Sequence, residues 1–215
     1  MVNVKDYVSR PVQDIIGAIF AEQKGLMEKY HEIEKGNGLV VYEPPLNLQL
    51  MTHQLRIKDF AWRITEELGE ALEALEDTPD YAHMEEEIAD ALHFLTELSI
   101  MVGHDPGKQV SMEELYDTAG EAMEPTAFRA NNLACLTYRV GVVVTRLAVT
   151  MNCLKNKPWK QSQMMTDTLY FNINLAKTWI AFIQLCIVAE ISPTDLYDLY
   201  SRKRQVNQFR QRSRY

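Results

Sequence analysis

The chain has 215 residues, of which 24% are charged, and its formal net charge is −8 at pH 7. This length is sufficient to bury a large hydrophobic core without disulfides, and the acidic balance argues against general nucleic-acid binding. The three cysteines are odd in number and lie in apolar runs, which is typical of buried thiols in a reducing compartment. We therefore expect a cytoplasmic protein with no nucleic-acid partner.

The sequence contains no strong export signal or membrane-spanning segment. The N-terminus lacks the basic and apolar regions of a secretory signal. The most apolar segment, residues 175–191, is interrupted by Lys177, Gln184 and Glu190, which favours a buried helix over a membrane span. We expect no membrane partner.

Glycine and proline are sparse and clustered, and the long stretches between them carry apolar residues at helical spacing. The predicted fold class is therefore all-α. Residues 38–42, which precede Pro44 and Pro45, are predicted to be a loop. The predicted helices cover residues 11–34, 47–76, 80–102, 111–120, 126–155, 161–190 and 193–211.

Residues 1–46 form a predicted N-terminal helical extension, whose charged helix with an apolar stripe suggests an additional packing or dimer element. Within it, Glu28 and His31 have the Glu-x-x-His spacing that di-iron helical bundles use twice. The second copy is missing, since Asp90 and His93 make only an imperfect substitute. A di-iron protein is therefore an alternative that the sequence supports less well.

The next two predicted helices carry acidic pairs. Glu67 and Glu70 are three residues apart, so both carboxylates emerge on one helical face, and Glu87 and Asp90 repeat this spacing. A short connection makes the two helices antiparallel neighbours. We expect the carboxylates of both pairs to come together.

Acidic helix faces are most often simply solvated. Here, however, the acids lie at the border of the core-facing stripe, next to apolar residues such as Leu68 and Ile88. Like charges on one face repel, so inward-pointing carboxylates are best maintained where a hard divalent cation binds them. The sequence predicts a site for two or more Mg²⁺ ions, with Mn²⁺ as a substitute, held by Glu67, Glu70, Glu87 and Asp90.

A faint internal repeat follows. The segment 111–117 recurs as 192–198, and each resembles a capped helix start after a long apolar helix. Two stacked helical hairpins are predicted, a first repeat over about 47–120 and a degenerate second repeat over about 126–199. Aligning the repeats replaces the four acids, in chain order, by Val143, Arg146, Asn174 and Lys177. The second repeat is therefore expected to be structural.

The two acidic pairs, in the form Glu-x-x-Glu followed by Glu-x-x-Asp, resemble the all-α nucleotide pyrophosphohydrolase superfamily of dimeric dUTPases and MazG-like enzymes. The run Asp90 to Phe94 resembles the Asp-x-x-His-Phe segment of dimeric dUTPases. Residues 200–211 resemble their signature Tyr-x-x-Lys-x-x-x-Asn-x-x-Arg-Gln, through Tyr200, Lys203, Asn207 and Arg210. The resemblance covers residues 47–215, the predicted pyrophosphohydrolase domain, with a basic tail at 200–215.

The resemblance implies Mg²⁺-dependent cleavage of a deoxynucleoside triphosphate to the monophosphate and pyrophosphate, with dUTP the leading substrate and dCTP next. It implies that Glu67 or Glu70, with Glu70 preferred, acts on the attacking water. Lys203, Asn207 and Arg210 would close over the nucleotide. It also implies a homodimer.

Some features depart from the family pattern. The tryptophan-containing segment between the acidic pairs is absent, and a related string with Trp159 lies in the second repeat instead.

Gln49 and Gln54 lie roughly where dimeric dUTPases place a glutamine near the base. His93 either lies near the base or the metal ions, or is a hydrogen-bonded core histidine. The alternatives are a MazG-like house-cleaning pyrophosphatase of another nucleoside triphosphate and a catalytically idle protein-binding module.

Overall fold

The computed structural model describes residues 14–123 and 133–213, and within them every regular element is a helix. The all-α fold class is confirmed. The elements are α1 (Ile15–Gly36), α2 (Met51–Glu73), α3 (Tyr81–Val102), the short 3₁₀ helix η2 (Pro106–Lys108), α4 (Met112–Glu121), α5 (Leu133–Asn152), α6 (Thr168–Val188) and α7 (Pro193–Ser213).

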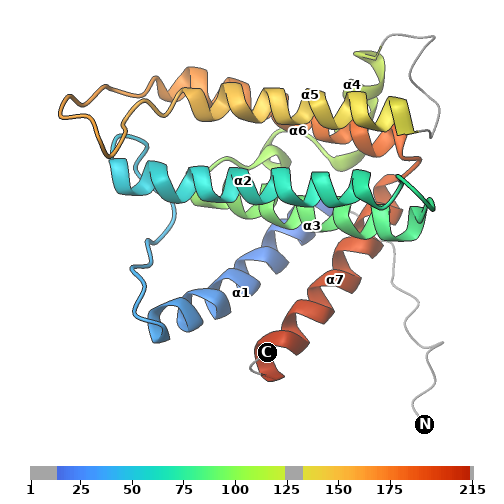
Figure 1. Ribbon diagram of the computed structural model, residues 1–215, viewed down its shortest axis with the longest axis horizontal. Helices are drawn as coiled ribbons and strands as arrows, with labels where there is room; N and C mark the ends of the chain where they lie inside the picture. Colours follow the sequence, from blue (N-terminus) through green and yellow to red (C-terminus); the bar gives the residue numbers. More distant parts are fainter. Residues whose placement is uncertain (1–13, 124–132, 214–215) are drawn as a thin grey trace.

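Two long helical hairpins form the centre of the molecule. Helices α2 and α3 pack along their length, as do α5 and α6, and α2 lies against α5 (Figure 1). Helices α1 and α7 run obliquely across the other side of α3 and contact each other. The stacked hairpins agree with the predicted repeat.

The two predicted helix starts have matching caps. The Ser111 hydroxyl accepts from the Glu114 backbone N–H at 3.2 Å, and the Ser111 N–H donates to the Glu114 carboxylate at 2.8 Å. Ser192 and Asp195 make the same reciprocal pair, each bond being 3.2 Å. This capping-box geometry satisfies backbone donors that a helix start leaves open, so the repeated segments do the same structural task.

Helices α5 and α6 are each long and apolar enough to cross a membrane by length and composition alone. In the bundle, however, 67% of the most apolar window of α6 is buried. Trp179 of α6 packs on Phe20 of α1 with ring centroids 6.1 Å apart, and its indole N–H donates to the Ser99 hydroxyl at 2.9 Å. The apolar character of α6 is thus explained by its central place in the core.

The predicted start of the second long helix, at residue 47, was four residues too early. The Asn47 side chain accepts from the Gln49 N–H at 2.8 Å, which closes a turn, and α2 begins only at Met51. The predicted helix 161–190 likewise begins at Thr168, because the Asp167 carboxylate caps it by accepting from the Tyr170 N–H at 2.9 Å.

For the predicted helix 126–155, the described part is α5, which ends at Asn152, and residues 126–132 lie outside the described residues. The first helix, predicted at 11–34, begins at Ile15 in the structure. Asp14 caps it by accepting a hydrogen bond from the Gly17 N–H at 2.8 Å. Residues 11–13 are outside the described part. Helix α1 buries its apolar stripe against α3 and α7, so it shares the core of the domain that follows it.

Candidate metal and nucleotide site

Helices α2 and α3 bring three of the predicted acids together. Glu67 and Glu70 lie one turn apart on α2, and Glu87 lies on the facing side of α3. One carboxylate oxygen from each of these residues lies within 4.8 Å of those of the other two. Among the residues that the structure describes, this is the only such group of potential metal ligands. All three donors are hard oxygens, which suit Mg²⁺ or Mn²⁺.

The electrostatics of this acidic cluster agree with cation binding. The pKa of Glu67 is raised to about 8, chiefly by burial, then by the close approach of Glu87 and by the negative charges of Asp90 and Glu70. Glu87 is itself buried and lies 3.5 Å from the His83 imidazole. A divalent cation would offset this repulsion, so the donor set fits a metal.

Asp90, the fourth predicted ligand, contacts a basic residue instead. Its Oδ2 atom lies 2.6 Å from the Lys203 Nζ atom of α7, which is also 3.8 Å from Glu86. Burial raises the pKa of Asp90, while the hydrogen bond and charge of Lys203 lower it. Asp90 lies on the face of α3 that carries Glu87, one turn further on, and it borders the same cavity as Glu67.

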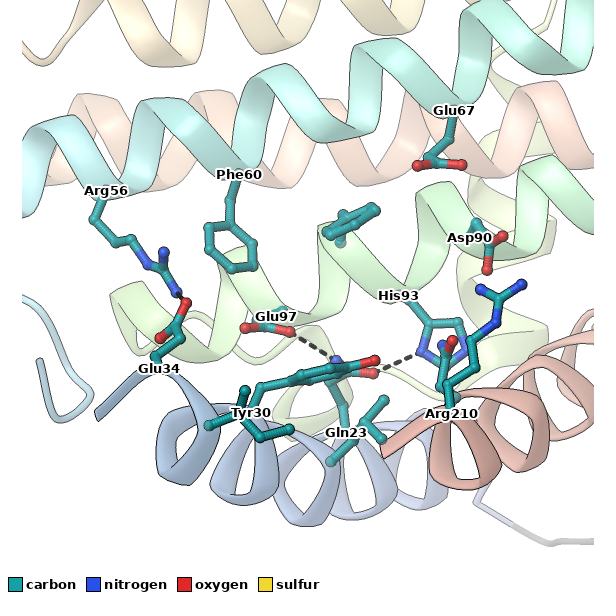
Figure 2. A pocket seen from close by; sticks show the side chains of 14 residues that line it. Gln23, Tyr30, Glu34, Arg56, Phe60, Glu67, Asp90, His93, Glu97 and Arg210 are labelled. Carbon is teal, nitrogen blue, oxygen red and sulfur yellow. Dashed lines mark hydrogen bonds and ion pairs between the residues drawn. The ribbon is translucent and has the colours of Figure 1, made fainter. Parts of the chain in front are cut away.

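A cavity of about 410 Å³ extends from the acidic cluster between α1, α2, α3 and α7 (Figure 2). Its volume lies in the range usual for small-ligand sites. Glu67, Asp90 and Arg210 lie at one end, and Arg56 and Glu34 at the other. The remaining lining residues are Gln23, Leu26, Tyr30, Ile33, Phe60, His93, Phe94, Glu97 and Asn207.

Two of the three predicted tail residues line this cavity. Asn207 and Arg210 of α7 form part of its wall, opposite the α2 acids, whereas Lys203 reaches Asp90 from the same helix. Tyr200 is buried, and its hydroxyl donates to Gln23 Oε1 at 2.8 Å. Helix α7 thus places cationic and amide side chains beside the acidic cluster.

His93 is a buried, hydrogen-bonded histidine at the cavity wall. Its Nδ1 atom lies 2.8 Å from Gln23 Oε1, its Nε2 atom lies 3.3 Å from the Tyr200 carbonyl oxygen, and its ring stacks on Tyr200 with centroids 4.0 Å apart. Burial lowers the pKa of His93 to about 4, so the ring is neutral at pH 7. In this structure His93 fixes the positions of Gln23 and Tyr200 and lines the cavity.

Gln49 and Trp159 do not line the cavity. The Gln49 amide donates to the Thr166 carbonyl oxygen at 3.0 Å, and Gln54 is fully buried, donating to the Leu48 carbonyl oxygen at 2.7 Å. Trp159 is 76% exposed, in the loop between α5 and α6. The hydrogen bonds of these two glutamines hold that loop against the start of α2, so their role in this structure is structural.

The second repeat carries cationic residues at two of the four positions where the first carries acids. Val143 is buried in the core, as expected of a structural position. Arg146 and Lys177 line a cavity of about 390 Å³ between α5 and α6, together with Arg139. The Arg139 guanidinium donates to the Gln184 side-chain oxygen at 3.0 Å. The described part of this repeat therefore has no acidic cluster of its own.

Gln23, Arg56, Phe60 and Glu97 also line the cavity, although no motif in the sequence marks them. One signal was available for Glu97, because it lies seven residues after Asp90 and hence on the same face of α3. Gln23 carried no comparable signal, since nothing in the sequence fixes where α1 packs. The Glu28–His31 pair does not belong to the acidic cluster, so the described residues give the di-iron alternative no support.

The helical hairpins and the acidic cluster together define an all-α protein with a candidate metal-ligand set beside a ligand-sized cavity. A family model described as dUTPase matches residues 58–215, well over half of the chain. The chain belongs to this dUTPase family, within the superfamily of dimeric dUTPases and MazG-like proteins. Comparisons with curated proteins and with solved structures gave no match. Helix α1 lies before the matched region.

Proposed function

We propose that this protein hydrolyses a deoxynucleoside triphosphate to the monophosphate and pyrophosphate with Mg²⁺, dUTP being the first candidate by family and dCTP the second. The observation that carries the proposal is the cluster of Glu67, Glu70 and Glu87, of which Glu67 lines one end of a cavity of about 410 Å³. Arg210 and Asn207 line the same cavity and supply donors for phosphate oxygens.

In the proposed reaction a water oxygen attacks the α-phosphorus, a new P–O bond forms, and the bond between the α-phosphorus and the bridging oxygen breaks. Pyrophosphate leaves with that bridging oxygen. Glu67, Glu70 and Glu87, joined by Asp90 when Lys203 turns to a phosphate, would hold the cations. Bound Mg²⁺ supplies charge neutralisation for the leaving pyrophosphate and a lower pKa for a bound water.

The proton of the attacking water passes to the Glu67–Glu70 pair. Glu70 is exposed, whereas Glu67 is half-buried and lines the cavity. Separate Glu67→Gln and Glu70→Gln variants would show which carboxylate controls the acidic limb of the pH–rate profile.

The direct test is pyrophosphate release from a panel of deoxynucleoside and ribonucleoside triphosphates with Mg²⁺. Turnover restricted to pyrimidine deoxynucleotides supports the proposal. Turnover of other nucleotides instead indicates the MazG-like house-cleaning alternative. Absence of turnover in a folded, Mg²⁺-loaded protein contradicts the proposal and indicates the idle binding module.

A homodimer in the cytoplasm completes the proposal. Leu169, Tyr170 and Ile173 at the start of α6 are all at least 42% exposed, an apolar surface suited to a second copy of the chain. The three cysteines are free and buried, which suits a reducing compartment. Sedimentation equilibrium should give twice the chain mass of 24.8 kDa, and Leu169→Glu should shift it toward the monomer.

A further inference from the structure

Glu97 is a buried carboxyl group whose hydrogen bonding within the described residues is incomplete. Only 6% of its surface is exposed, and it lines the cavity beside the acidic cluster. Its Oε2 atom accepts from the Gln23 amide N–H at 2.9 Å, and no hydrogen bond to its Oε1 atom occurs in the part of the chain that the structure describes. The Oε1 atom is open to the cavity and is not enclosed in the core, so a ligand that supplies a hydrogen-bond donor can reach it.

The Gln23 amide is held in one orientation. Its oxygen accepts from the Tyr200 hydroxyl at 2.8 Å and lies 2.8 Å from His93 Nδ1. This orientation goes with the neutral His93 tautomer that carries its proton on Nδ1. The Gln23 nitrogen is therefore directed at Glu97, and Glu97 must present Oε1 to the cavity (Figure 2).

The nearest cation does not neutralise Glu97. Arg56 of α2 is paired with Glu34 of α1 and lies over the Phe60 ring, 4.6 Å from its centroid. Phe60 and Phe94 meet edge to face with centroids 6.0 Å apart and give this end of the cavity an aromatic wall. An acceptor oxygen beside aromatic rings is suited to a flat heterocycle that carries a hydrogen-bond donor.

The two ends of the cavity differ in chemistry. Glu67, Asp90 and Arg210 lie at one end, where metal and phosphates would bind, and Glu97 and Phe60 lie further in (Figure 2). A nucleotide with its phosphates at the acidic cluster therefore extends its base toward Glu97. This step rests on the proposed function.

We propose that Glu97 reads the base by accepting a hydrogen bond from the 4-amino group of cytosine, and that the enzyme therefore prefers dCTP to dUTP. An ionised carboxylate is only an acceptor, and cytosine presents its amino donor where uracil presents a carbonyl acceptor. The single uracil N–H lies between two carbonyl oxygens, so a carboxylate that approaches it also faces their lone pairs. Gln23, from outside the region matched by the family, positions Glu97 for this contact.

The protonation state of Glu97 gives the selectivity a pH dependence. Burial raises the pKa of Glu97 to about 7, although the Gln23 hydrogen bond and the Arg56 charge lower it. The acceptor form is therefore lost below this pH, and the preference for dCTP falls. The other titratable groups in the cavity wall are Tyr30 and Glu34 on α1, Arg56 and Glu67 on α2, Asp90 and His93 on α3, and Arg210 on α7.

The test compares kcat/KM for dCTP and dUTP in the wild type and in Glu97→Gln. Because Gln23 directs its N–H at position 97, the new amide must accept with its oxygen and offer its NH₂ group to the base, which suits the uracil carbonyl. We expect the dCTP/dUTP ratio to fall by at least about tenfold and to lose its pH dependence between about pH 6 and 8. Glu28→Gln, at an exposed position of α1 outside the cavity, is the matched control and should leave the ratio unchanged.

A second measurement needs no variant. The 2-pyrimidinone deoxynucleoside triphosphate lacks any group at C4, so the wild type should hydrolyse it at least about tenfold less efficiently than dCTP. Equal dCTP/dUTP ratios in wild type and Glu97→Gln, or equal rates for dCTP and the analogue, would overturn the base reading and leave the proposed function intact. No hydrolysis of any deoxynucleotide by the wild type would overturn both.

Discussion

The Lys203 Nζ atom lies 2.6 Å from Asp90 Oδ2, so the C-terminal helix is joined to the acidic site by a direct ion pair. Both side chains are largely buried, at 16% and 20% exposure. Asp90 is therefore occupied by an ammonium group in the position where the family resemblance expects a metal ligand. Exchange of Lys203 from Asp90 to a substrate phosphate would couple nucleotide binding to completion of the metal site.

Lys203→Met should weaken both phosphate binding and the control of the Asp90 pKa by this lysine. Loss of a charge-assisted hydrogen bond to phosphate should lower kcat/KM roughly 10- to 100-fold. The pKa of Asp90 should rise further, since Lys203 now lowers it, so that Mg²⁺ activation requires a higher pH. Steady-state kinetics at several pH values would check this. Lys160→Met, at an exposed position, is the control, and equal losses in the two variants would contradict the assigned role.

Glu87→Gln should abolish most of the metal-dependent activity. This residue is the buried member of the acidic cluster, and an amide has neither the charge nor the ligand strength of a carboxylate. We expect kcat/KM to fall on the order of 100-fold and the Mg²⁺ concentration for half activation to rise. Glu73→Gln, at an exposed position one turn beyond Glu70, should behave as wild type. An unchanged Mg²⁺ titration in Glu87→Gln would remove this residue from the metal site.

The metal-free protein should lose stability as the pH rises from about 6.5 to 8. The folded-state pKa of Glu67, about 8, and of Glu97, about 7, exceed the ordinary value of 4.5, so the folded chain retains protons that the unfolded chain has released. That stabilisation is complete below pH 4.5 and disappears as each folded-state pKa is passed. His93, with a lowered pKa of about 4, acts in the opposite direction only below its ordinary value of 6.5.

Thermal unfolding across this range, with and without Mg²⁺, would check the prediction. Mg²⁺ should restore the melting temperature at about pH 8, because it binds the deprotonated acids. Glu67→Gln should flatten the pH dependence. A melting temperature of the metal-free protein that stays constant or rises between about pH 6.5 and 8 would contradict the assigned pKa shifts.

Gln54→Leu should lower stability without affecting the metal site. The fully buried Gln54 side chain donates to Leu48 and Thr166 and accepts from the Asn156 backbone N–H at 2.9 Å. Its removal leaves several buried groups without a partner, which should lower the free energy of unfolding by about 1–3 kcal/mol. Chemical denaturation would measure this loss. A change in substrate selectivity with no loss of stability would instead support a place for this glutamine near the base.

Much of this arrangement was predictable from sequence because it follows from local patterns. Apolar spacing predicted the helices, the Ser111 and Ser192 segments predicted paired caps, and the spacing of Glu67 and Glu70 placed both on one face of α2. The convergence of this pair with Glu87 required only that neighbouring helices be antiparallel.

Long-range packing was not predictable in the same way. The contact between Gln23 and Glu97 joins residues 74 positions apart, and it depends on how α1 crosses α3. The pairing of Asp90 with Lys203 likewise depends on the path of α7, although the family signature drew attention to both residues. The observed start of a helix differs from the predicted one where a side chain caps the first turn, as Asp167 does at α6.

The most direct test of the central claim is the fate of the solvent oxygen. The protein would be incubated with dCTP or dUTP and Mg²⁺ in ¹⁸O-labelled water, and the products would be analysed by mass spectrometry. The account predicts one ¹⁸O atom in the deoxynucleoside monophosphate, unlabelled pyrophosphate, on the order of 100-fold slower product release after Glu87→Gln, and no products after removal of the metal. Release of a diphosphate and inorganic phosphate, label in the pyrophosphate, or turnover that survives metal removal would contradict it.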